Sequence, residues 1–126
     1  MKKLVLIYCL FTVSIFSQWV PQTSGTIEKL NDAIFQNQTT GYVCGNSGVI
    51  LKTTDGGTNW IAKPSNTSHD LKCIMINPVN NDYVLAVGNV STLLLSTNAG
   101  ATFSNVAVSP VDWNKVRHAD IFNVYV

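Results

Sequence analysis

Short apolar runs alternate with turn-rich joins along most of this chain. The runs predict two sets of four strands, at about residues 30–36, 41–45, 49–53 and 60–63, and at about 71–77, 83–88, 92–96 and 103–108. The joins are rich in Asn, Gly, Pro and Thr, which are typical turn residues. Beyond residue 18 no segment keeps a helical apolar period for more than a turn or two, so the domain is expected to be all-β.

The stretch from Thr53 to Trp60 predicts a tight turn between two antiparallel strands. The Asp55 carboxylate can accept hydrogen bonds from backbone N–H groups two or three residues ahead. Gly56 and Gly57 allow the positive φ angles that such a reversal needs. We expect the Thr53 hydroxyl to brace the loop and the Trp60 indole to lie beneath it as an apolar plug.

The same skeleton returns 43 residues later, where Ser96, Asn98, Gly100 and Phe103 match Thr53, Asp55, Gly57 and Trp60. Residues upstream of the two turns match at the same offset. A period in the forties with several short strands per unit is typical of propeller blades. The second copy departs from the first in two ways: an amide replaces the carboxylate, and a phenyl ring replaces the indole.

The pattern S/T-x-D-x-G-x-x-W at Thr53–Trp60 resembles the Asp-box, or BNR repeat, of sialidase-like propellers. The longer string GYVCGNSGVILKTTDGGTNW is most similar to photosystem II stability/assembly-factor-like propellers, many of them secreted. The resemblance covers roughly residues 19–126. It implies a structural role for the box at a hairpin turn on the outer part of a blade, away from the central channel. It implies a fold and no particular reaction.

The first 18 residues have the layout of a secretory signal peptide, with Lys2 and Lys3 before an apolar run at 4–16. This run is shorter than the roughly 20 residues that span a bilayer. We therefore expect export to the periplasm, the cell surface or the medium, with cleavage near Ser17 and no membrane span afterwards.

The expected mature domain, residues 19–126, is an incomplete β-propeller. It begins on the last strand of one blade, continues through blades at about 30–63 and 71–108, and starts a third blade at 116. Propellers close with about four to eight blades. The favoured interpretation is the N-terminal part of a longer protein, and the alternative is a ring assembled from several short chains. Alone, such a domain is expected to expose apolar faces and to self-associate.

Charge and cysteine content limit the classes of function that fit this chain. The chain has eight basic and seven acidic residues, and removing Lys2 and Lys3 leaves six basic residues with Arg117 as the only arginine. This near-neutral balance argues against nucleic-acid binding. Cys44 and Cys73 lie in apolar strands, where buried free thiols are favoured over a disulfide, although export permits one.

No residue pattern selects a catalytic, cofactor or metal site. Arg117 and His118 are candidates to line the channel, because they alternate on the opening strand of the third blade. Asp32, Asp70 and Asp120 could supply the carboxylate pair of an inverting glycosidase, yet nothing selects two of them. A single arginine argues against a sialidase site, in which the resemblance implies three.

Three functions remain open. The favoured one is a non-catalytic interaction or assembly scaffold that binds another protein. The alternatives are the N-terminal part of a glycan-active hydrolase and a glycan-binding adhesin module.

Overall fold

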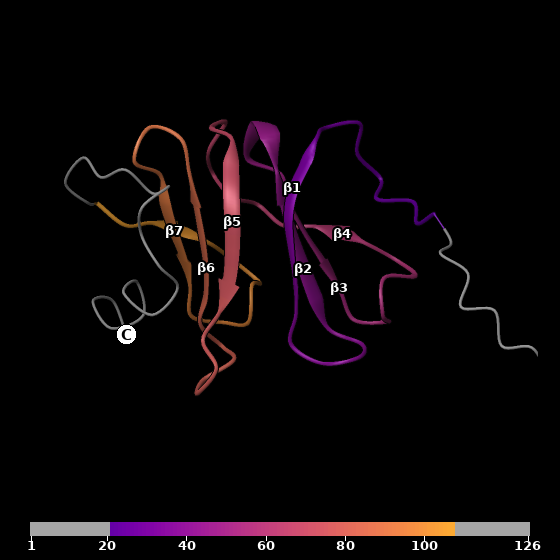
Figure 1. The fold of residues 1–126 in the computed structure, drawn as a ribbon. Coiled ribbons are helices and arrows are strands. Elements are labelled where there is room, and N and C mark those ends of the chain that lie inside the picture. Colours follow the sequence, from indigo (N-terminus) through magenta and orange to yellow (C-terminus); the bar gives the residue numbers. More distant parts are fainter. Residues whose placement is uncertain (1–20, 108–126) are drawn as a thin grey trace, which may run out of the picture.

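The computed structural model describes residues 21–107, which form two four-stranded antiparallel sheets side by side (Figure 1). The first sheet has the order β1-β2-β3-β4, and its strands are Leu30–Phe35, Gly41–Gly45, Ile50–Thr53 and Ile61–Ala62. The second has the order β5-β6-β7-β8, with strands Leu71–Ile76, Val84–Gly88, Leu93–Ser96 and Ser104–Asn105. The predicted all-β architecture of two four-stranded antiparallel units is therefore confirmed.

Helical structure among residues 21–107 is limited to the 3₁₀ turn η1, Asn46–Gly48. Within that range there is no helix long and apolar enough to cross a bilayer. The predicted signal peptide, the strand at Trp19, and the third blade with Arg117, His118 and Asp120 lie outside the described residues.

The two sheets repeat each other in register. The pairing shifts between Leu30 and Asp32 in the first sheet, and between Leu71 and Cys73 in the second. The loop after the second strand is also repeated, since Asn46 N–H donates to the Lys29 carbonyl at 2.8 Å and Asn89 N–H donates to the Asp70 carbonyl at 2.9 Å. The sequence repeat is thus a repeat of backbone structure.

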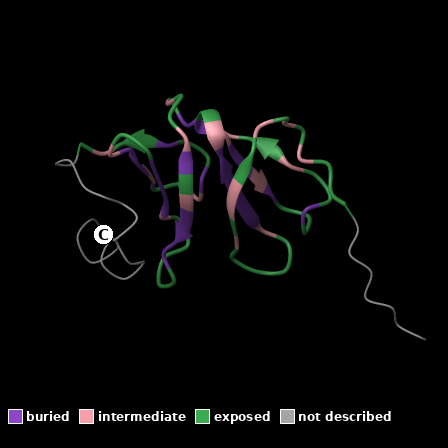
Figure 2. Cartoon of the chain, turned by 45° about the horizontal axis from the view of Figure 1, so that its top comes forward, coloured by how far each residue is buried: buried purple, intermediate pink, exposed green. Residues whose placement is uncertain are grey.

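Strands β2 and β6 are buried along their whole length, whereas the short outer strands β4 and β8 are exposed (Figure 2). A strand buried on both faces carries apolar residues without alternation, as VLAVG does in β6. Other exposed residues lie in the loops at the two ends of the sheets and along β1.

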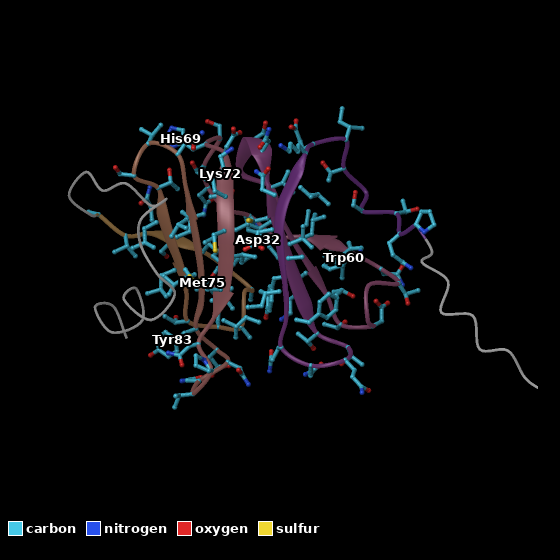
Figure 3. The ribbon with its side chains drawn as sticks, in the orientation of Figure 1. Asp32, Trp60, His69, Lys72, Met75 and Tyr83 are labelled. Atoms are coloured by element: carbon cyan, nitrogen blue, oxygen red, sulfur yellow. The ribbon has the colours of Figure 1, made fainter. Side chains whose placement is uncertain are left out.

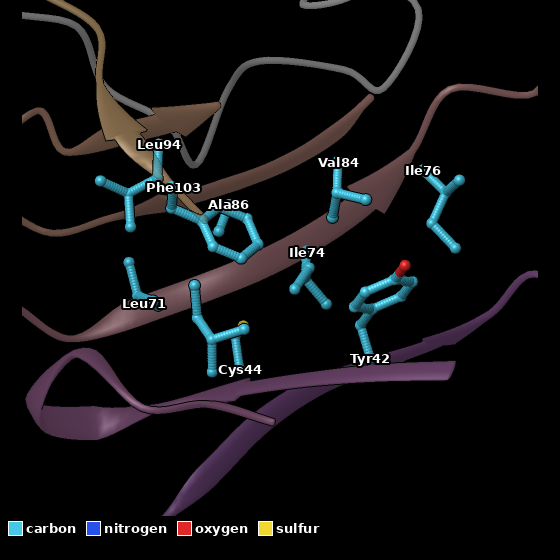
Figure 4. Packing of buried hydrophobic residues seen from close by; sticks show 10 residues of the cluster. Tyr42, Cys44, Leu71, Ile74, Ile76, Val84, Ala86, Leu94 and Phe103 are labelled. Carbon is cyan, nitrogen blue, oxygen red and sulfur yellow. The ribbon is translucent and has the colours of Figure 1, made fainter. Parts of the chain in front are cut away.

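The main core lies between the two sheets (Figure 4). The first sheet contributes Tyr42, Cys44 and Ile50, and the second contributes Leu71, Ile74, Ile76, Val84, Ala86, Leu94 and Phe103. A smaller cluster of Met75, Leu85, Val87 and Leu93 covers the other face of the second sheet. Strand β5 contacts both β1 and β2, so the inner strand of the second sheet packs on the first sheet.

Candidate functional site

The two matched turns share a hydroxyl-centred hydrogen-bond network. The Thr53 hydroxyl donates to Asp55 Oδ1 at 2.8 Å and accepts from Gly57 N–H at 2.9 Å. The Ser96 hydroxyl donates to Asn98 Oδ1 at 2.9 Å and accepts from Gly100 N–H at 2.8 Å. Both hydroxyls therefore brace their loops in the same way.

The side chains at Asp55 and Asn98 reach four residues ahead, farther than the two or three expected. Asp55 accepts from the Asn59 backbone N–H at 2.9 Å and from the Asn59 side-chain amide at 2.8 Å. Asn98 accepts from Thr102 N–H at 3.0 Å, and its own amide donates to the Thr102 hydroxyl at 2.8 Å. The direction of the side-chain bond is thus reversed in the second turn. Asp55 accepts from the Asn59 amide, whereas the Asn98 amide donates to the Thr102 hydroxyl.

This difference predicts that a second substitution restores the stability lost in the first. Asp55→Asn should lower the melting temperature, because the new amide nitrogen faces the Asn59 amide instead of accepting from it. The double variant Asp55→Asn/Asn59→Thr recreates the pair seen in the second turn and should recover most of the loss. Thermal denaturation of the three proteins checks this. A double variant less stable than Asp55→Asn would show that the turns are not equivalent.

The Asn59 backbone N–H, the Asn59 amide and the Thr53 hydroxyl hold the pKa of Asp55 below its usual value. A carboxylate with a depressed folded-state pKa stabilises the fold above its unfolded pKa, near 3.9. That contribution is lost as the pH falls through the folded-state value. The melting-temperature difference between wild type and Asp55→Asn should therefore shrink below about pH 4.

The two aromatic residues that follow the turns differ in burial. Phe103 is 2% exposed and belongs to the core between the sheets. Trp60 is half-buried and packs edge-on against Phe35, with ring centroids 6.1 Å apart. The Trp60 indole therefore lies beside its turn, but it is less enclosed than the expected plug.

The second turn is anchored to the first sheet through one carbonyl. The Ala99 oxygen accepts from the Tyr42 hydroxyl at 2.8 Å and from Lys52 Nζ at 2.6 Å. Burial is the main cause that raises the pKa of Tyr42 and lowers the pKa of Lys52. Lys52 Nζ also lies 5.3 Å from the centre of the Tyr42 ring. These contacts join residues 47 to 57 positions apart in the sequence.

Ala99 makes these contacts from a left-handed backbone, with φ of 53°, where the first turn has Gly56 at φ of 72°. A side chain in this conformation costs about 1–2 kcal/mol. Ala99→Gly should therefore stabilise the fold by about 0.5–1 kcal/mol, after allowing for the greater freedom of glycine in the unfolded chain. Urea denaturation measures this change. Ala101→Gly, two residues away without a positive φ, is the control and should not stabilise; loss of stability in Ala99→Gly would contradict the strain argument.

The inner strands are joined by a carboxylate between the sheets (Figure 3). Asp32 Oδ2 accepts from Ile74 N–H and Oδ1 accepts from Ala33 N–H, both at 2.9 Å. Asn31 adds a second link, since its amide donates to the Leu71 carbonyl at 2.7 Å.

Directly before β5, Asp70 Oδ1 accepts from Ser47 N–H at 3.1 Å, and its other oxygen pairs with Lys72 at 3.2 Å. The Ser47 N–H and Lys72 hold the pKa of Asp70 below its usual value. Asp32 and Asp70, two candidates for a hydrolytic pair, thus hydrogen-bond to backbone groups between the sheets.

The remaining candidates do not form a reactive cluster among the described residues. Cys44 and Cys73 are free thiols, Cys44 buried and Cys73 half-buried. Burial, with the nearby Asp32 carboxylate, raises the pKa of Cys44 to about 12 and that of Cys73 to about 11. His69 Nδ1 lies 2.9 Å from the Thr92 hydroxyl. Within residues 21–107 no three His, Cys, Asp or Glu side chains are grouped to hold a metal ion.

Strands β1 and β5 both end toward the lower edge of the sheets in Figure 1. A groove of about 460 Å³ lies at these two strand ends. It is lined by Ile34, Phe35, Gln36, Ile76, Pro78 and Asn81. None of these side chains carries a charge. No sequence motif predicts this groove, because its two walls come from different repeats and neither wall contains a motif.

Two solved structures share this fold. "YCF48 bound to D1 peptide" matches with a TM-score of 0.59 at 19% identity, over 66% of this chain and 27% of that one. "YCF48 from Cyanidioschyzon merolae" matches with a TM-score of 0.57 at 23% identity, over 66% of this chain and 28% of that one. The chain thus spans little more than a quarter of these proteins, and its two sheets are blades of an incomplete β-propeller.

The family comparison covers more of the sequence. No curated protein matches the chain. Residues 12–112 match the family described as "Photosynthesis system II assembly factor YCF48". This range takes in both blades, both turns and all the contacts between them. The chain therefore belongs to the YCF48 photosystem II assembly-factor family, which confirms the resemblance given by its turn motif.

Proposed function

We propose that this chain is a non-catalytic part of a protein-binding propeller and acts as an interaction or assembly scaffold. Its family is named for an assembly factor, and one YCF48 of similar fold was solved with a D1 peptide bound. Carried over to this chain, these observations support a segment of another protein as the ligand class.

The observation that carries the proposal is the structural use of three carboxylates within the fold. Asp32, Asp55 and Asp70 each accept a backbone N–H, and Asp32 and Asp70 do so across the two blades. Carboxylates held in this way fix loops and strands, and general acid–base catalysis needs a carboxyl group placed at a substrate instead. A rigid pair of blades with a neutral groove suits binding better than hydrolysis.

The proposal gives the eight matched turn residues a structural role: Thr53, Asp55, Gly57, Trp60, Ser96, Asn98, Gly100 and Phe103. It also includes export, supported by Lys2, Lys3 and the apolar run at 4–16. Mass spectrometry of the protein recovered from a bacterial host should find a new N-terminus near Ser17. An intact N-terminus on all of the protein would contradict export.

Selection from a random peptide library displayed on phage tests the ligand class. The full chain should enrich peptides that, once synthesised, bind saturably in isothermal titration calorimetry. A glycan array serves as the parallel test. Failure to enrich any peptide, or saturable binding to glycans with none to peptides, would contradict the protein-binding proposal and favour the glycan-binding alternatives.

A further inference from the structure

The inner strands β1 and β5 are edge strands, and both direct backbone groups away from their own sheets. The N–H groups of Ala33 and Ile74 show this directly, because both donate to the Asp32 carboxylate. In an antiparallel ladder, residues two positions apart point their backbone groups the same way. Phe35 and Ile76, two residues farther along each strand, therefore also direct N–H and C=O groups outward.

The next residues confirm this alternation. Gln36 N–H donates to the Thr40 carbonyl at 2.9 Å, and Asn77 N–H donates to the Tyr83 carbonyl at 3.0 Å. These inward bonds close the two hairpins and leave Phe35 and Ile76 as the outward-facing positions. Both residues line the groove between the blades. The residues that line the groove thus include one outward-facing position from each of two edge strands.

The walls of the groove carry no charged side chain. The Asp32 carboxylate already accepts from the outward N–H groups of Ala33 and Ile74. A peptide backbone could therefore pair only farther along the two strands, at Phe35 and Ile76. Ile34 and Pro78 provide apolar surface, and the exposed amides of Gln36 and Asn81 provide donors and acceptors. Its volume of about 460 Å³ falls in the range of about 300–1,000 Å³ typical of ligand pockets.

We propose that this groove binds an extended, uncharged peptide segment by adding its backbone to the edges at Phe35 and Ile76. Backbone pairing at a free strand edge is an established mode of peptide recognition. A charged side chain placed in the groove would lose water without gaining an oppositely charged partner among the lining residues, which selects against acidic and basic segments. This inference rests on the proposed protein-binding function and specifies its site and ligand chemistry.

The test uses peptides selected by the full chain from the phage library, made with capped ends. The variant Gln36→Glu/Asn81→Asp places two carboxylates on the groove and removes two amide donors. It should weaken binding at least tenfold. The control Gln38→Glu/Asn105→Asp makes the same charge change at exposed positions off the groove and should leave affinity within twofold. Melting temperatures establish that both variants are folded.

A second measurement does not depend on any protein variant. Methylating one backbone nitrogen in the centre of the peptide removes an N–H and should weaken binding at least tenfold at one or more positions. Three results would overturn the proposal for this groove while leaving protein binding intact. The selected peptides could be rich in charge, they could bind both double variants equally, or they could tolerate N-methylation at every position. Failure to select any peptide would overturn both proposals.

Discussion

Phe103→Ala should destabilise the protein by about 3–5 kcal/mol, the usual cost of removing a buried phenyl ring. Phe103 is 2% exposed and packs in the core between the two blades. The vacated space lies between two sheets that are also joined by hydrogen bonds, so it cannot close easily. Urea denaturation of the full chain measures the loss.

Trp60→Ala is the matched control, because Trp60 occupies the same position in the first repeat. Its ring is larger but only half-buried, with Phe35 as its aromatic neighbour. The loss of stability should therefore be smaller than for Phe103→Ala. An equal or larger loss would show that the first turn, and not the contact between the blades, dominates stability.

Gly48→Ala should cost a similar amount, about 2–5 kcal/mol, from two sources. Gly48 has φ of 73°, and a side chain there costs about 1–2 kcal/mol. An added Cβ would also lie 2.0 Å from the Thr67 carbonyl oxygen, in the segment that joins the blades. Overpacking of this kind adds about 1–3 kcal/mol.

Gly25→Ala separates the two sources. Gly25 has a nearly identical φ of 75°, and an added Cβ would meet nothing within 4 Å. It should therefore show only the backbone cost, about 1–2 kcal/mol. If the two variants lost equal stability, close packing of the joining segment on the loop at Gly48 would not matter to the fold.

The architecture could be predicted because it is encoded locally and then repeated. Hydrophobic runs of strand length and turn residues predicted the two units. The strand bounds agree to within one residue except at the last end, where the predicted strand runs to about residue 108 and β8 ends at Asn105. The turn at Thr53 was predictable because its network lies within seven residues, although Asp55 reaches Asn59 instead of a nearer N–H. The second turn followed from its alignment with the first.

Contacts between the blades could not be predicted from the sequence. The Ala99 carbonyl binds Tyr42 and Lys52 from the other repeat, and an alanine gives no signal for a left-handed turn position. The hydrogen bond from Ile74 N–H to Asp32 joins residues 42 positions apart, so it could not be foreseen from the sequence. Without that partner, Asp32 remained a candidate for catalysis. The groove was missed for the same reason, since β1 and β5 meet only in the folded chain.

Hydrogen–deuterium exchange with and without a selected, capped peptide tests most directly the claim that the inner strand edges bind protein while the turns hold the blades. The backbone amides of Phe35 and Ile76 should exchange more slowly when the peptide is bound, and the amides of Thr53–Trp60 and Ser96–Phe103 should be unchanged. Protection of either turn, with none at Phe35 or Ile76, would contradict the account.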